Sequence, residues 1–272
     1  MKRTIRGAAF AAAPLLIVPA AQAQWSAPYT APRNASVDAA GARSVEVEAA
    51  AGELRVEGKE GLRQVQITGT ARSSSQQLLS QIRLIAERRG DVIFIKAEMP
   101  DDSWRNNSFG DHTAILDLVI QVPKGIDADV TDGSGDVKIF DVGSLDATDG
   151  SGDFSVIGAA GTVRITDGSG DLRIENVGGD LRVSDGSGDI NARNITGSFT
   201  VESDGSGGIY ATDVRGSVVV QSDGSGDVEA SRVGKDFRVQ SKGSGDINYT
   251  EVSGQVSIPD RDRGHRRSRS DR

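Results

Sequence analysis

Aspartates recur in a five-residue word that the chain repeats seven times. Carboxylate oxygens are ligands that Ca²⁺ prefers, so a regular array of them suggests metal binding. The word Asp-Gly-Ser-Gly-Asp begins at Asp132, Asp149, Asp167, Asp185 and Asp223, with the variants Asp-Gly-Ser-Gly-Gly at Asp204 and Lys-Gly-Ser-Gly-Asp at Lys242. The candidate calcium ligands are the two aspartates of each full word: Asp132, Asp136, Asp149, Asp153, Asp167, Asp171, Asp185, Asp189, Asp223 and Asp227.

Two interpretations of these aspartates stay open. Stacked copies of the word would hold like carboxylates about 4.8 Å apart, where they repel one another unless a cation such as calcium lies between them. Alternatively, each aspartate accepts hydrogen bonds from the amides of its own turn and is solvated. Lys242 and Gly208 replace two aspartates without disturbing the surrounding pattern, which favours the second interpretation. No cofactor other than calcium is expected.

Catalytic chemistry has little support in the residue types. The chain has no cysteine, and its two histidines, His112 and His265, stand in a polar stretch and in the C-terminal tail. A Ser-His-Asp triad could use only these two histidines. An active site is expected to depart locally from a repeat, whereas these carboxylates are the repeat. We therefore expect no enzyme, with a polysaccharide-acting parallel β-helix enzyme as the alternative.

The spacing of the words indicates a repeat architecture. Successive words begin 17, 18, 18, 19, 19 and 19 residues apart. Between words, apolar and polar residues alternate in two short runs, such as Leu172-Arg-Ile and Leu181-Arg-Val, and this period of two predicts two strands per repeat. So small a unit buries its apolar face only by stacking on identical units. The prediction is an all-β fold, a single-stranded parallel β-helix (β-solenoid) of seven two-strand coils over residues 132–258.

Turn chemistry explains the word itself. Its two glycines permit positive φ in a tight turn, and its Asp and Ser side chains can hydrogen-bond turn amides. The step from 18 to 19 residues predicts one extra residue per coil, at Ser203, Ser222 and Ser241.

The chain before the words predicts a less regular β cap over residues 43–131, which would cover an open solenoid edge. Residues 44–58 and 65–67 are similar to degenerate coil strands. A short helical turn is expected over residues 76–80, a hairpin over 82–97 turning at Arg89-Gly90-Asp91, and a strand over 115–122.

Residues 1–23 are typical of a secretory signal peptide. Basic residues at positions 2, 3 and 6 precede an uncharged run, and Ala21-Gln22-Ala23 is a small-x-small signature that places cleavage between Ala23 and Gln24. The run is too short for a transmembrane span, which needs roughly 20 residues. We expect export to the periplasm, the cell surface or the medium.

The net charge disfavours two classes of partner, nucleic acid and anionic lipid. The net charge is −8, while the signal segment and residues 260–272 each carry +3, so residues 24–259 carry −14 (−8 − 3 − 3). A body this acidic repels nucleic acid and anionic lipid. Residues 24–42 are expected to be a flexible segment, and residues 259–272 a disordered, arginine-rich tail.

The export signal, the strand ending in Val122-Pro123-Lys124-Gly125 and the tandem Asp-Gly-Ser-Gly-Asp coils together resemble a bacterial family of unknown function described as candidate adhesins. They are similar also to the head domains of candidate autotransporter adhesins. The resemblance covers about residues 44–258 and implies a β-solenoid at the cell envelope. The expected function is an adhesin-like or structural binding module for an envelope glycan or protein; a calcium-stabilised scaffold is a further alternative.

Overall fold

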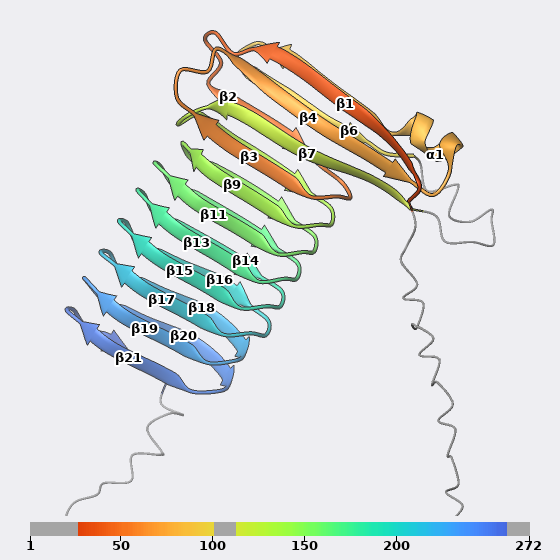
Figure 1. The fold of residues 1–272 in the computed structure, drawn as a ribbon. Helices are drawn as coiled ribbons and strands as arrows, with labels where there is room; N and C mark the ends of the chain where they lie inside the picture. The colour runs from red at the N-terminus through yellow and green to blue at the C-terminus, as the bar shows by residue number, and fades with distance from the viewer. Residues whose placement is uncertain (1–26, 101–112, 260–272) are drawn as a thin grey trace, which may run out of the picture.

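Alternating apolar and polar residues build almost the whole chain into two parallel stacks of strands. The computed structural model describes residues 27–100 and 113–259, and Figure 1 shows them as a ladder of coils beneath a cap of longer strands. Two 11-stranded sheets, called sheet A and sheet B here, enclose one apolar core.

Sheet A contains, in spatial order, β1 (Tyr29–Asp38), β4 (Gln64–Ser73), β7 (Ala114–Pro123), β3 (Leu54–Lys59), β9 (Val137–Val142), β11 (Phe154–Ala159), β13 (Leu172–Val177), β15 (Ile190–Ile195), β17 (Ile209–Val214), β19 (Val228–Val233) and β21 (Ile247–Val252). Sheet B contains β22 (Val256–Ser257), β20 (Phe237–Ser244), β18 (Val218–Ser225), β16 (Phe199–Asp204), β14 (Leu181–Asp185), β12 (Val163–Asp167), β10 (Leu145–Asp149), β8 (Asp127–Asp132), β2 (Ser44–Glu48), β6 (Val92–Glu98) and β5 (Arg83–Arg89). The described helix is α1 (Gln76–Gln81), and no helix in this part of the chain is long and apolar enough to cross a bilayer.

Each coil runs along a strand of sheet B, turns at the word and returns along a strand of sheet A. Neighbouring coils pair in parallel and in register, so that Val163 of β12 lies between Leu145 of β10 and Leu181 of β14. Matching residues therefore form continuous columns. The predicted parallel β-solenoid is confirmed.

The inward columns fill the core as the period of two requires. Phe154, Phe199 and Phe237 are among the largest fully buried side chains. In the last coil, Tyr249 and Val256 are exposed instead, because no later strand in the described chain covers them.

Close stacking, as well as backbone conformation, explains the glycines. The second glycine of each word has positive φ, but the first does not, so the expectation of positive φ at both was half right. The first glycine lies against the carbonyl of the matching glycine one coil earlier: a Cβ on Gly186 would lie 2.3 Å from the oxygen of Gly168. A side chain at either position would push the coils apart.

The cap contains a true coil that is out of sequence order. β2 and β3 pair in parallel with β8 and β9 on one side and with β6 and β7 on the other. Residues 44–58 are thus solenoid strands, as predicted. Residues 65–67 are not, because β4 pairs antiparallel with β7. The hairpin is confirmed as β5 and β6, and α1 as the short helix, with the Ser75 hydroxyl accepting from the Leu78 amide.

The expectation of a flexible segment over residues 24–42 is wrong for most of its length. β1 occupies residues 29–38 and pairs antiparallel with β4 through ten successive residues. Its small residues Ala31, Ala35 and Val37 pack against the core. Arg33 anchors the strand by donating to the carbonyls of Ile82 and Leu79, at 2.8 and 2.9 Å.

The longer coils accommodate their extra residue near the end of the sheet B strand. Between β14 and β16 the register shifts after Val183, so that Ser184 pairs with Ser203 and Glu202 is skipped. The extra residue in this coil is therefore Glu202, one position before the predicted Ser203. Because of the shift, Asp204 still pairs with Asp185.

We predict that Gly188→Ala lowers the free energy of unfolding by roughly 2 to 4 kcal/mol. Gly188 has φ +134°, and a Cβ there would lie 1.9 Å from the carbonyl oxygen of Gly170. Gly90→Ala is the control, since Gly90 also has positive φ (+67°) but no atom within 4 Å of the added carbon. Urea unfolding measures both variants, and equal losses would contradict the stacking explanation.

Candidate functional site

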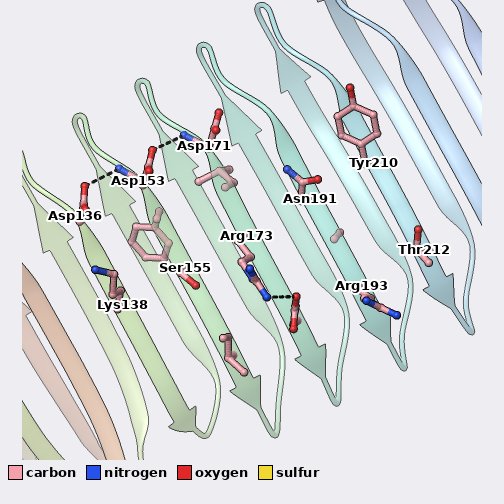
Figure 2. Close-up of a pocket in the computed structure, with 15 residues that line it drawn as sticks. Asp136, Lys138, Asp153, Ser155, Asp171, Arg173, Asn191, Arg193, Tyr210 and Thr212 are labelled. Atoms are coloured by element: carbon pink, nitrogen blue, oxygen red, sulfur yellow. Dashed lines mark hydrogen bonds and ion pairs between the residues drawn. The ribbon is translucent and has the colours of Figure 1, made fainter.

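The outer face of sheet A carries a shallow groove that crosses five coils. It has a volume of about 1210 Å³ and runs over β9, β11, β13, β15 and β17. The outward residues next to the buried first residue of each strand form its floor: Lys138, Ser155, Arg173, Asn191 and Tyr210 (Figure 2). Their side chains differ from coil to coil, although the strands beneath them repeat.

Side chains of both signs of charge line the groove, together with apolar surface that includes the half-buried Ile157. Arg173 pairs with Glu175 at 2.9 Å, and Lys138 pairs with Glu53 at 2.8 Å. The hydrogen bond that Lys138 donates to Glu53 raises the pKa of Lys138, so this ammonium stays charged. At the far end, Tyr210 presents a half-buried ring, and burial together with Asp189 raises the pKa of its hydroxyl.

The last aspartates of the words line one edge of the groove. Asp136, Asp153 and Asp171 belong to it, and each carboxylate accepts a hydrogen bond from the backbone amide one coil further on. Figure 2 shows the bonds that join Asp136, Asp153 and Asp171 in series. In the same way, the Gly208 amide donates to Asp189 and the Asp246 amide donates to Asp227. These aspartates thus bond the next coil, and not the amides of their own turn as the second interpretation expected.

The first aspartates of the words are in a different environment: they are buried. Along β10 the residues Leu145, Ala147 and Asp149 all face inward, because the aspartate continues the alternation of the strand. Six such residues pair in register through sheet B and form the aspartate column: Asp132, Asp149, Asp167, Asp185, Asp204 and Asp223. Each is between 3% and 5% exposed, so the expectation that all word aspartates are solvated is wrong for this row. The expected bond to an amide of the same turn does form at Asp185, which accepts from the Ser187 amide at 3.2 Å. The alternation of inward and outward residues along each sheet B strand was the sequence signal that could have identified these aspartates as buried.

Burial and mutual repulsion act together on this column. Burial, with the neighbouring carboxylates, raises the pKa of Asp132, Asp167 and Asp204 to about 7. Burial also raises the pKa of Asp149 and of Asp185. Losing water favours the neutral form of a carboxyl group, and a like charge nearby favours it further.

Lys242 ends the column with a positive charge. It pairs in register with Asp223, and its ammonium lies 2.7 Å from a carboxylate oxygen of that residue. The side chain of Lys242 is 3% exposed and that of Asp223 is 0% exposed. The lysine that replaces aspartate in the seventh word therefore forms a buried ion pair with the aspartate of the preceding word. The sequence change thus has a structural consequence.

Several residues considered from the sequence lie outside the described chain: His112, His265, the cleavage residues Ala23 and Gln24, and the arginine-rich residues from 260 onward. Within residues 27–100 and 113–259 there is no histidine, and no group of three or more acidic side chains converges as a metal cluster would. The groove therefore offers side chains for binding and no arrangement for general acid–base catalysis by histidine.

We predict that the melting temperature falls as the pH rises from about 4 to about 7, in metal-free buffer. The raised pKa values mean that the folded column keeps protons which the unfolded chain has released above about 3.9, so this stabilisation is present at low pH and is lost on passing about 7. Thermal melting of Asp167→Asn should show a shallower fall, because one buried group no longer titrates. Asp153→Asn, on the exposed row of the preceding word, should keep the wild-type slope, because Asp153 is not among the charges that raise the pKa of the column. A slope unaffected by Asp167→Asn would contradict the prediction.

Comparison with known proteins places the chain in a family. No curated protein matches it. Similar solved structures include a candidate cell adhesion protein from Clostridium sporogenes (13% identity, TM-score 0.31, covering 85% of this chain and 99% of the other) and a candidate adhesin from Bacteroides fragilis (15%, 0.37, 85% and 98%). A third is a candidate lipid binding protein from Parabacteroides distasonis (15%, 0.44, 84% and 97%). Residues 41–266 match the model of the Toastrack DUF4097 family, a domain of unknown function, and the chain belongs to that family.

Proposed function

We propose that this protein is an exported, non-enzymatic binding module of the bacterial envelope, and that the groove on sheet A binds an extended envelope glycan. The observation that carries the proposal is the row of unlike polar side chains laid across five identical strands. With strands about 4.8 Å apart, the row from β9 to β17 is about 19 Å long. Such a surface fits a polymer that lies across several coils.

Side-chain chemistry favours a glycan over a protein as the ligand. The floor offers amide, guanidinium, hydroxyl and ammonium groups, and its borders add carboxylates. None of the large apolar side chains exposed in the described chain, which are Tyr29, Val119, Tyr249 and Val256, lies in the groove. Protein interfaces usually have an apolar centre, whereas a hydroxyl-rich polymer needs many donors and acceptors beside an aromatic ring such as Tyr210.

The carboxylates beside the groove support binding over catalysis. Asp153 and Asp171 each accept an amide of the next coil, so they take part in holding the solenoid together. A general acid needs a carboxyl group that is protonated near neutral pH. The buried carboxyls with raised pKa are those of the aspartate column, which faces the interior and does not line the groove. The polysaccharide-acting enzyme therefore remains the weaker candidate.

We predict that Arg173→Ala weakens binding to soluble envelope polysaccharides about tenfold, because a hydrogen bond to a charged group contributes about 1.5 kcal/mol. The matched control is Arg182→Ala on β14: Arg182 is an exposed arginine on the strand that follows β13 but belongs to sheet B, and its loss should leave the affinity unchanged. Isothermal titration calorimetry gives the affinities, and a reducing-end assay on the same mixtures detects cleavage. Equal effects of the two variants would contradict the groove as the glycan-binding site. New reducing ends would support the alternative that the protein is a polysaccharide-acting enzyme.

Export is tested separately. We expect the full chain, produced in a bacterium, to leave the cytoplasm with a mature N-terminus at Gln24, because residues 1–23 have the charge, apolar run and small-x-small signature of a signal peptide. Fractionation followed by N-terminal sequencing measures this. A chain that lacks residues 1–23 should stay in the cytoplasm. An unprocessed full chain in the cytoplasm would contradict export.

A further inference from the structure

The aspartate column contains buried oxygen atoms that have no hydrogen-bond donor. Both carboxylate oxygens of Asp132, Asp149, Asp167 and Asp204 lack a donor in hydrogen-bonding geometry, as does one oxygen each of Asp185 and Asp223. Amides of the same turn lie close enough to lower the pKa of the first four carboxyls in part, and the Ser187 amide donates to the other oxygen of Asp185 at 3.2 Å. A buried acceptor without a donor is costly, and a buried charge is more costly. Five in-register pairs of such residues follow one another along the rod. The gaps between them call for groups of positive charge.

Lys242 shows, independently, that this column holds a cation. Its ammonium occupies the interior of the last word and contacts three oxygen atoms: a carboxylate oxygen of Asp223 at 2.7 Å, the carbonyl of Ser244 at 2.7 Å and the carbonyl of Gly226. A carboxylate from the coil before and two backbone carbonyls thus surround a buried positive charge. The earlier words have the same backbone turn and the same inward carboxylate, so they can offer the same kinds of oxygen.

The spacing of the coils selects the size of the cation. Matching oxygens of parallel in-register strands repeat at about 4.8 Å, so an ion midway between two of them lies about 2.4 Å from each. Calcium binds oxygen at about 2.3 to 2.6 Å, whereas magnesium requires about 2.0 to 2.1 Å. Two carboxylates match the charge of one divalent ion. Because Asp223 pairs with Lys242, the other five carboxylates balance at most two such ions, so ions occupy some of the gaps and not every one.

We propose that the aspartate column binds Ca²⁺ between successive coils, and that Lys242 supplies the positive charge where the column ends. Because no three acidic side chains converge in the described chain, each bound ion takes two carboxylates from neighbouring coils and backbone carbonyls complete the coordination. Asp204, from the variant word, joins the ligands. Asp136, Asp153, Asp171, Asp189 and Asp227 do not, because each already accepts an amide of the next coil. This site is independent of the groove and of the proposed function.

The experiment is thermal melting of the full chain at pH 8 after removal of metal with a chelator. We expect millimolar CaCl₂ to raise the midpoint by several degrees and MgCl₂ at equal concentration to raise it less. Asp167→Asn should reduce the calcium response, whereas Asp171→Asn, in the exposed row of the same word, should keep it in full. A midpoint unchanged by calcium in the folded wild-type protein would overturn the proposal and assign the charge balance to protons alone.

A second variant keeps the proposal testable if Asp167→Asn does not fold. Lys242→Asp lengthens the column by one carboxylate and removes its fixed positive charge. It should bind more calcium per chain than the wild type in equilibrium dialysis, and its melting midpoint should depend more steeply on calcium. The same calcium content in both proteins would count against the column as the binding site.

Discussion

In-register parallel pairing of the coils is the interaction on which the rest of this structure depends. It gives each coil a full set of backbone hydrogen bonds, and it also places every side chain about 4.8 Å from the matching side chain of the next coil. For the inward Val, Ile, Leu and Phe residues this stacking is favourable, because continuous columns fill the narrow interior. For an inward carboxylate the same stacking is unfavourable, because like charges gather away from water. The repeated word therefore has to keep the coils in register and also accommodate the stacked carboxylates.

The direction in which a residue faces, more than its type, decides what it does in this solenoid. Asp167 and Asp171 stand four residues apart in one word and differ in burial and in hydrogen bonding. Asp167 faces inward, is buried, and has its pKa raised to about 7 by burial and by Asp149 and Asp185. Asp171 faces solvent and fixes the next coil through the amide of Asp189. The inward position is kept even where the repeat lengthens, since the register shift at Glu202 returns Asp204 to the column. A longer coil thus still presents its aspartate inward. This indicates that the fold maintains the aspartate column itself, and that the column is not a by-product of the turn sequence.

The local part of the fold could be predicted from the sequence, and the part that depends on distant pairing could not. Nearly constant word spacing and a period of two were enough for the solenoid and its inward columns, and the Arg89-Gly90-Asp91 turn indicated the β5–β6 hairpin. The inward aspartates could have been read from the parity of Val163, Ile165 and Asp167, but the word was interpreted as a turn. β1 gave little signal because its inward residues are small, and β4 resembles a coil strand locally although it pairs antiparallel with β7. Nothing in the spacing indicates that β2 and β3 lie between β6–β7 and β8–β9.

The groove on sheet A could not be predicted from the repeat, because the residues that form its floor differ from coil to coil. The repeat is enforced where coils touch: at the glycines, in the apolar columns and in the two rows of aspartates. Outward positions on sheet A carry no such demand, so the sequence is free to place Lys138, Ser155, Arg173, Asn191 and Tyr210 in succession on identical backbone. A binding surface assembled in this way combines a stiff frame with a row of side chains that can each be chosen separately. In the binding module proposed for this protein, specificity belongs to the outward positions whose residue differs from coil to coil, while the repeated residues hold the coils at the spacing that makes the row continuous.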